Sequence, residues 1–145
     1  MVAYQHTSRT PASPEAVWRL YSDVASWPRW NTAVGRLDLD GPFAAGATGQ
    51  LTPPGAGPLP FRVVAATQNE GYVSETDIAE TVTLRTTSRL TRLPDGGTEV
   101  SQHVELVGPA AEYFGQSFGP ALAAGVPRTA EAVAAHAAAL EESLP

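Results

Sequence analysis

The spacing of apolar residues changes once along this chain, near Pro109, and that change limits the folds it can adopt. Between Val34 and Val107 apolar and polar side chains alternate in short runs, which indicates strands. Beyond Pro109 the apolar residues recur at helical spacing, along one stripe of a long helix. Strands joined by short turns pair antiparallel, and a helix after them must cover one face of the sheet. The pattern therefore predicts an α+β domain.

Turn signals rich in glycine, proline and asparagine divide the strand block from Val34 to Val107 into separate strands. The clearest is Asp95-Gly96-Gly97, because glycine tolerates the positive φ of a tight hairpin turn. A further strand is expected over Val2–Thr10, where side chains also alternate. The strands predicted in the block itself are Val34–Leu39, Ala47–Leu51, Phe61–Thr67, Tyr72–Ile78, Thr81–Leu93 and Thr98–Val107.

Helices are expected on both sides of the strand block. Ser13 is a favourable N-cap, and Pro14 stands at the first helical position, where a missing N–H is tolerated. A short helix should start there, and a second helical turn is expected around Trp27–Asn31. The long C-terminal helix contains Pro120 and Pro127, so a bend or break is predicted within it.

Composition excludes several kinds of site. The 145 residues suit one domain, 1–145, and the absence of cysteine excludes disulfides and thiolate metal sites. All basic residues are arginine, which excludes Schiff-base and Walker-type lysine chemistry. The net charge of −6 argues against nucleic acid or an anionic membrane as partner. With no signal peptide and no apolar run of the roughly 20 residues that cross a bilayer, a cytoplasmic protein without membrane insertion is expected.

Short motifs along nearly the whole chain carry a family resemblance. They are Ala12-Ser13-Pro14-Glu15-Ala16-Val17-Trp18, Trp27-Pro28-Arg29-Trp30-Asn31, Leu39-Asp40-Gly41-Pro42-Phe43 with Gly46, Gly96-Gly97-Thr98-Glu99-Val100 and Gly108-Pro109. In this order they resemble the SRPBCC (START-like) superfamily, and most closely its polyketide cyclase/dehydrase and lipid-transport branch. The resemblance implies a helix-grip fold: a seven-stranded curved antiparallel sheet wrapped around the long C-terminal helix, with two short helices after the first strand. It also implies a cavity between sheet and helix.

Strand alternation assigns the side chains that would face such a cavity. On the last strand the apolar Val104 must point inward, so Gln102 does too, while His103 points to water. The inward candidates on the two preceding strands are Tyr72, Ser74, Thr76, Leu84, Thr86 and Ser88. This is more polar surface than a closed core tolerates, which favours a ligand pocket. The alternative is that these groups pair with one another or with buried water.

Aromatic residues outside the sheet are further candidates for ligand contact. Trp27, Trp30 and the adjacent Asn31 follow the first helix, and the two tryptophans are placed at the mouth of the cavity. Tyr113, Phe114 and Phe118 on the long helix are placed at its floor. Ordinary core packing is the alternative for all of these rings. The loop from Pro53 to Pro58 is a candidate rim or lid, or a plain connection.

Catalytic motifs are weak in this sequence. Gly115–Gly119 matches the G-x-S-x-G nucleophile pattern, but it lies in a helical stripe rather than at a strand–turn–helix elbow. The histidines lack the i, i+4 spacing of metal ligands, so no metal is expected. No cofactor is expected either, since Gly55-Ala56-Gly57 lacks the third glycine of a dinucleotide fingerprint. His6 and Tyr113 are the weak candidates for proton transfer. Related sequences often carry histidine at the positions of Ser88 and Gln102, from which this chain departs.

These observations favour binding without catalysis. The leading hypothesis is that a small, mostly apolar molecule, a lipid or a polyketide, binds between sheet and helix. The alternative is a polyketide cyclase or dehydratase that holds a poly-ketone chain in a reactive fold. A third interpretation is an interaction domain with a filled core. Whether the chain is an enzyme, and whether it is a monomer or a homodimer, stays open at this point.

Overall fold

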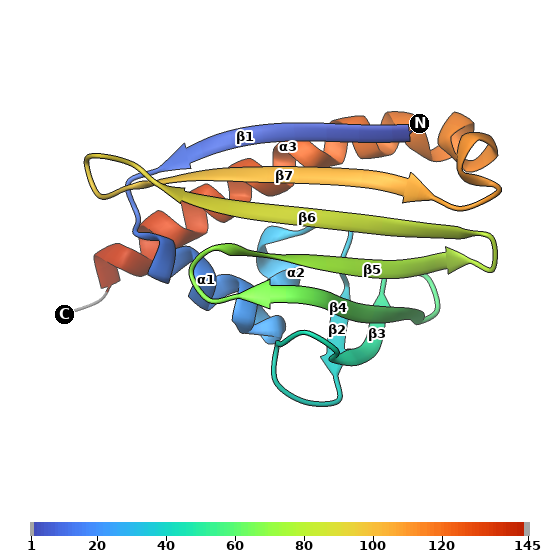
Figure 1. Cartoon of the computed structure of the whole chain (residues 1–145), viewed down its shortest axis with the longest axis horizontal. Coiled ribbons are helices and arrows are strands. Elements are labelled where there is room, and N and C mark those ends of the chain that lie inside the picture. The colour runs from blue at the N-terminus through green and yellow to red at the C-terminus, as the bar shows by residue number, and fades with distance from the viewer. Residues whose placement is uncertain (1, 144–145) are drawn as a thin grey trace.

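The computed structural model shows a long curved sheet with a single long helix lying across one face (Figure 1). It describes residues 2–143, so Met1, Leu144 and Pro145, which belong to the predicted domain, lie outside the described residues. The strands are β1 (Val2–Thr10), β2 (Arg36–Leu39), β3 (Thr48–Thr52), β4 (Leu59–Thr67), β5 (Gly71–Ala79), β6 (Val82–Arg92) and β7 (Thr98–Val107). The helices are α1 (Pro14–Ser22), the 3-10 turn η1 (Val24–Ser26), α2 (Trp27–Trp30) and α3 (Ala111–Ser143).

The sheet has seven strands in the order β1-β7-β6-β5-β4-β3-β2, and every neighbouring pair is antiparallel. The predicted α+β helix-grip fold is therefore confirmed, with the first strand beside the last. The strands predicted to begin at Val34, Ala47 and Thr81 start too early. Val34 N–H donates to the carbonyl of Asn31 at 3.1 Å and Ala47 N–H to that of Ala44 at 3.0 Å, so both residues close turns ahead of β2 and β3.

Helix α1 begins where its sequence predicts. The side chain of Ser13 accepts a hydrogen bond from the backbone N–H of Ala16 at 3.3 Å, and Pro14 opens the helix. Val17 and Tyr21, four residues apart, are both fully buried. The two short helices after β1 are therefore present as predicted, with η1 joining them.

Helix α3 is unbroken from Ala111 to Ser143, so of the predicted bend or break at Pro120 or Pro127 the break is wrong, and the bend stays a prediction. Each proline removes one backbone hydrogen bond, but α3 packs along β1 and β7, and this packing supports the turns on either side. No helix among residues 2–143 is long and apolar enough to cross a membrane.

Two glycines let α3 approach the edge strand β1. A Cβ atom on Gly115 would lie 2.7 Å from a methyl group of Val2, and one on Gly119 would lie 2.6 Å from the hydroxyl of Tyr4. A side chain at either position would force the facing side chain of β1, or the helix itself, to shift. The glycines of the G-x-S-x-G match thus serve helix packing, which agrees with its interpretation as a chance match to a nucleophile motif.

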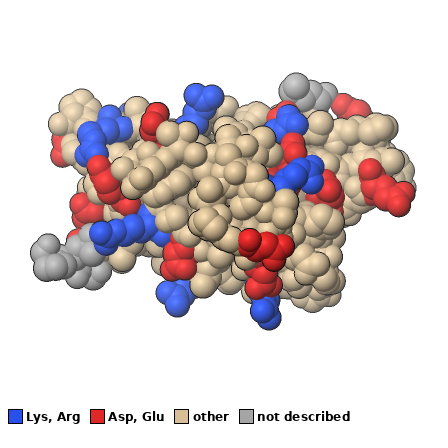
Figure 2. Space-filling view, turned by 60° about the horizontal axis from the view of Figure 1, so that its bottom comes forward, with Lys and Arg blue, Asp and Glu red and all other residues tan. Residues whose placement is uncertain are grey.

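Charged residues gather on the convex face of the sheet. Arg62 donates to Asp77 at 2.9 and 3.1 Å and to Glu75 at 2.9 Å. Arg85 donates to Glu75 at 2.8 Å, and Arg85 Nη1 lies 3.4 Å from Glu105. The outward orientation predicted for Glu75 and Asp77 is correct. Figure 2 shows charged side chains of both signs spread around an uncharged centre, with no large patch of one sign.

We expect Gly119→Ala to be less stable than Gly125→Ala by about 1–3 kcal/mol of unfolding free energy. Both changes gain the same helix propensity, but a Cβ at Gly125 meets nothing within 4 Å while one at Gly119 meets Tyr4. Urea unfolding of the two variants measures the difference. Equal stabilisation of both would show that the close approach to β1 does not constrain α3.

Asp77→Asn should lower stability at neutral pH by about 0.5–1 kcal/mol, because the ion pair is partly exposed. Hydrogen bonds from Arg62 hold the pKa of Asp77 below its usual range. The folded pKa lies below the unfolded one, so the pair stabilises the fold above the unfolded pKa, and this contribution is lost as pH falls through the folded pKa. The difference in unfolding free energy between wild type and Asp77→Asn should therefore disappear in acid. Urea unfolding at several pH values measures it.

The control is Asp38→Asn, since Asp38 pairs with Arg36 only across the exposed surface of edge strand β2. Its effect on unfolding free energy should be small at every pH. An Asp77→Asn loss that persists unchanged at the lowest pH where the protein stays folded would contradict the ion-pair explanation.

Candidate ligand cavity

A cavity of about 320 Å³ lies between the concave face of the sheet and helix α3. Its sheet wall consists of Leu51, Leu59, Phe61, Tyr72, Ser74, Thr76, Ile78, Leu84, Thr86, Gln102 and Val104. The helix contributes Phe118, Ala121, Leu122, Gly125, Val126 and Thr129, and the segments around α2 and β3 contribute Trp27, Asn31, Thr32, Ala33, Val34 and Pro53. The walls are mostly apolar, with a few polar side chains on adjacent strands, which is the usual composition of a small-molecule site.

The mouth of the cavity is marked by lining residues that are also exposed. These are Thr32 and Ala33, which follow α2, and Phe118 and Ala121 on α3. Phe118 is 46% exposed and stacks on Phe114, with ring centres 5.7 Å apart. Pro53 also lines the cavity, while the rest of its loop does not. A lid role for that loop therefore stays a prediction.

The lining residue Gln102 is hydrogen-bonded to the buried hydroxyl of Tyr21, which does not itself line the cavity. This oxygen accepts a hydrogen bond from Ser88 Oγ at 2.7 Å and another from Gln102 Nε2 at 3.1 Å. Burial raises the pKa of the Tyr21 phenol, and the two hydrogen bonds offset part of that rise, so the ring stays neutral. The bond to Ser88 holds α1 against the sheet. The bond to Gln102 fixes the position of an amide side chain that also lines the cavity.

Aromatic rings continue this wall. The ring of Tyr72 lies 4.9 Å from that of Tyr21 and 5.6 Å from that of Trp27, at edge-on or tilted angles. Trp27 Nε1 donates to the carbonyl of Tyr21 at 2.9 Å. Trp30 packs behind, 5.6 Å from Tyr21, and donates to Ser26 Oγ at 3.2 Å. Both tryptophans are buried, so they form the wall and its backing rather than the mouth.

Three hydroxyl groups on neighbouring strands remain available to a ligand. Ser74 and Thr76 follow one another on the inner face of β5, and Ser74 pairs with Thr86 of β6 in the sheet register. Within residues 2–143 no hydrogen bond joins these hydroxyls to another protein group. The amide of Gln102 lies on the next strand, beside Ser88. Together they form a short polar strip across an apolar wall.

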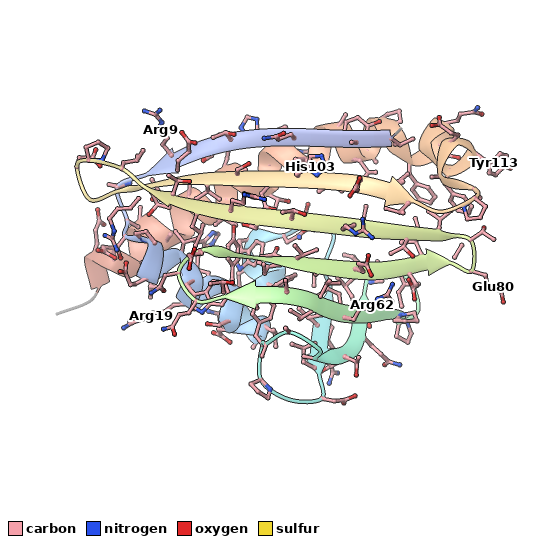
Figure 3. The ribbon with its side chains drawn as sticks, viewed as in Figure 1. Arg9, Arg19, Arg62, Glu80, His103 and Tyr113 are labelled. Atoms are coloured by element: carbon pink, nitrogen blue, oxygen red, sulfur yellow. The ribbon has the colours of Figure 1, made fainter. Side chains whose placement is uncertain are left out.

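Most of the predicted ligand-binding residues lie on the cavity wall. They are Trp27, Asn31, Tyr72, Ser74, Thr76, Leu84, Thr86, Gln102, Val104 and Phe118. Trp30, Ser88, Tyr113 and Phe114 do not line it. Tyr113 is 72% exposed and lies at the far end of the molecule, near the start of α3 (Figure 3). Of the three helix aromatics predicted at the floor, only Phe118 lines the cavity, and it lies at the mouth.

The two candidates for proton transfer lie outside the cavity. His6 belongs to the face of β1 that α3 covers, but its Nε2 lies 3.1 Å from Glu131 Oε1 of the helix and not on the cavity wall. Tyr113 is exposed. Among residues 2–143 no group of three His, Cys, Asp or Glu side chains is placed to hold a metal ion.

Several lining residues were not predicted from the sequence. Leu122 and Val126 belong to the apolar stripe of the long helix, and this helical spacing is the only sequence pattern that could indicate them. The segment Thr32–Val34 and the side chain of Pro53 carry no periodic pattern at all. Tyr21 falls in the apolar stripe of α1 and was not predicted to form hydrogen bonds. The inward-facing Ser88 and Gln102 are the only sequence signal that a buried hydroxyl lies opposite them.

Solved structures with the same architecture confirm the class of fold. Protein MLL2253 from Mesorhizobium loti matches with a TM-score of 0.76 and 18% identity over 99% of both chains. Ara h 8.0201 matches with a TM-score of 0.67 and 13% identity over 94% of this chain and 97% of that one. The di-domain ARO/CYC StfQ from the steffimycin biosynthetic pathway matches with a TM-score of 0.68 and 12% identity over 94% of this chain and 50% of its own.

A curved antiparallel sheet closed over one long helix, with a cavity between them, defines a START-like helix-grip protein. The chain belongs to the family described as polyketide cyclase / dehydrase and lipid transport, which matches residues 1–142. A search of curated proteins gives no match. Because the solved structures are all under 25% identical, their likeness establishes the fold and not the ligand.

Tyr21→Phe should destabilise the protein by about 1–3 kcal/mol, because it leaves the buried Ser88 and Gln102 side chains without their shared acceptor. Tyr4→Phe is the matched control, since the Tyr4 hydroxyl makes no hydrogen bond within residues 2–143. Chemical unfolding of both variants measures the effect. Equal stability of the two variants would show that the Tyr21 hydroxyl does not hold α1 to the sheet.

Proposed function

We propose that this protein binds a small, mostly apolar molecule in the cavity between sheet and α3 and releases it unchanged. The observation that carries the proposal is the cavity itself, about 320 Å³ in volume, with an apolar wall and free hydroxyls on it. A space of this size in a folded domain loses packing contacts unless something occupies it. Membership of a family described by cyclases and lipid transport agrees with such an occupant.

The apolar wall would supply most of the affinity. Burying roughly 250 Å² of apolar ligand surface contributes about 6 kcal/mol before the costs of association, at about 25 cal/mol per Å². The polar strip of Ser74, Thr76, Thr86 and Gln102 would orient the oxygen atoms of the ligand. We expect the protein to work in the cytoplasm as a monomer or homodimer and to carry its ligand through water.

A polyketide cyclase is the second candidate, and the ARO/CYC structural neighbours are the observation that favours it. Such an enzyme would fold a poly-ketone chain by confinement within the cavity. It would need a group that moves protons. His6 pairs with Glu131 outside the cavity, and burial raises the pKa of Tyr72 well above its ordinary value, so that phenol is no base at neutral pH. This arrangement supports carriage over catalysis.

The third interpretation, an interaction domain with a filled core, has less support. The space between the sheet and α3 is open rather than packed with side chains. A partner protein would also need an exposed docking face, whereas this cavity is a recess between the sheet and α3 with a small mouth.

Gly125→Leu should weaken ligand binding at least tenfold. Gly125 lines the cavity and a Cβ there meets nothing within 4 Å, so the leucine would project into the space that the ligand needs. Ala124→Leu is the matched control, since Ala124 is exposed on the same helix and lines no part of the cavity. Displacement of the uncharged dye Nile red, followed by fluorescence, measures binding in all three proteins.

Organic extraction of the purified protein and mass spectrometry should recover one apolar compound, and the Gly125→Leu protein should yield much less. The extracted compound is then added back to the protein and incubated. Its recovery unchanged supports carriage, while a cyclised product supports the cyclase. Equal Nile red binding by wild type and Gly125→Leu would contradict a site in this cavity.

A further inference from the structure

Among residues 2–143, no charged side chain lines the cavity. Every residue that lines it, from Trp27 to Thr129, is apolar, a hydroxyl-bearing residue, an amide or a neutral tyrosine. On β5 and β6, the charged residues that stand next to lining residues in the sequence are turned the other way by strand alternation. Glu75 stands between Ser74 and Thr76, and Arg85 precedes Thr86, yet both face the convex side and bond to one another at 2.8 Å.

The mouth of the cavity is also lined by uncharged side chains. Its exposed lining residues, Thr32, Ala33, Phe118 and Ala121, carry no charge either. The pair of His6 and Glu131 lies at the edge of the sheet, where β1 meets α3, and is not part of the lining. Within the described part of the chain, a ligand with an ionised group would therefore find no counter-charge on a residue that lines the wall or the entrance.

The polar groups on the wall do fit an uncharged ligand. Each hydroxyl of Ser74, Thr76 and Thr86 can donate one hydrogen bond and accept others, and none of them is used within residues 2–143. Hydroxyls and amides satisfy a carbonyl, an ether or a hydroxyl group. They do not offset the desolvation free energy of a carboxylate or an ammonium group that is buried beside them.

We propose that the cavity selects uncharged, oxygen-bearing hydrophobic molecules, such as alcohols, ketones, esters or phenols, and discriminates against amphiphiles with an ionised head group. The ligand would place its oxygen atoms against Ser74, Thr86 and Gln102 and its apolar part toward Leu84, Val104 and α3. This inference rests on the proposed function, because it assumes that the cavity takes a ligand.

The test compares probes of one chain length that differ in charge. 1-Decanol, methyl decanoate, decanoate and decyltrimethylammonium compete with Nile red at neutral pH, each below its micelle concentration. Decanol and methyl decanoate should bind at least tenfold more tightly than the two ions. If decanoate or decyltrimethylammonium binds as tightly as methyl decanoate, the charge selectivity is refuted while ligand binding stands.

If none of the four probes competes and Gly125→Leu leaves Nile red binding unchanged, the proposed function fails, and this inference fails with it. A second pair of measurements isolates the polar strip. Ser74→Ala and Thr86→Val should reduce the preference for decanol over decane several-fold and leave the affinity for decane unchanged. An unchanged preference in both variants would contradict the role of these hydroxyls, whatever the result with the ions.

Discussion

The hydroxyl of Tyr21 joins parts of the chain that are far apart in sequence, and the cavity depends on that junction. It accepts hydrogen bonds from Ser88 of β6 and Gln102 of β7, which pair with each other in the sheet. Both donors must face inward to reach it. A slip of either strand by one residue would turn its donor to the convex face and leave a buried phenol without partners. The same interaction thus fixes strand register and the position of α1, and through α1 it places Trp27 in the cavity wall.

The open space is a consequence of how α3 is seated. At β1 the helix lies very close to the sheet, because Gly115 and Gly119 present no side chain there. Further from that edge, where Gly125 faces the cavity, nothing lies within reach of a Cβ atom. Helix α3 packs extensively on β1, less on β7 and little on β6. The sheet therefore curves away from a helix that is held at one edge, and the volume between them widens toward β5 and β4.

Sequence alternation predicted the inner faces of the central strands correctly, because the side-chain period of a strand is fixed by backbone geometry. Ser74, Thr86 and Gln102 all line the cavity as a result. The helical aromatics were predicted less well. Which side of α3 faces the sheet depends on the close approach at Gly119, a tertiary contact that periodicity does not encode, so Tyr113 points outward. Loop residues such as Thr32 reach the wall only through the path of the chain after α2.

The family resemblance implies histidine at the positions of Ser88 and Gln102, and the structure shows what these two residues do instead. In this chain both side chains donate to Tyr21, so the positions serve a neutral hydrogen-bond network. A histidine at either place would bring a titratable group to the wall or directly behind it. The amide of Gln102 instead keeps the wall uncharged while still offering hydrogen bonds to a ligand. The two residues that hold α1 to the sheet thus put a serine and a glutamine at these positions, which agrees with the proposed binding of an uncharged ligand.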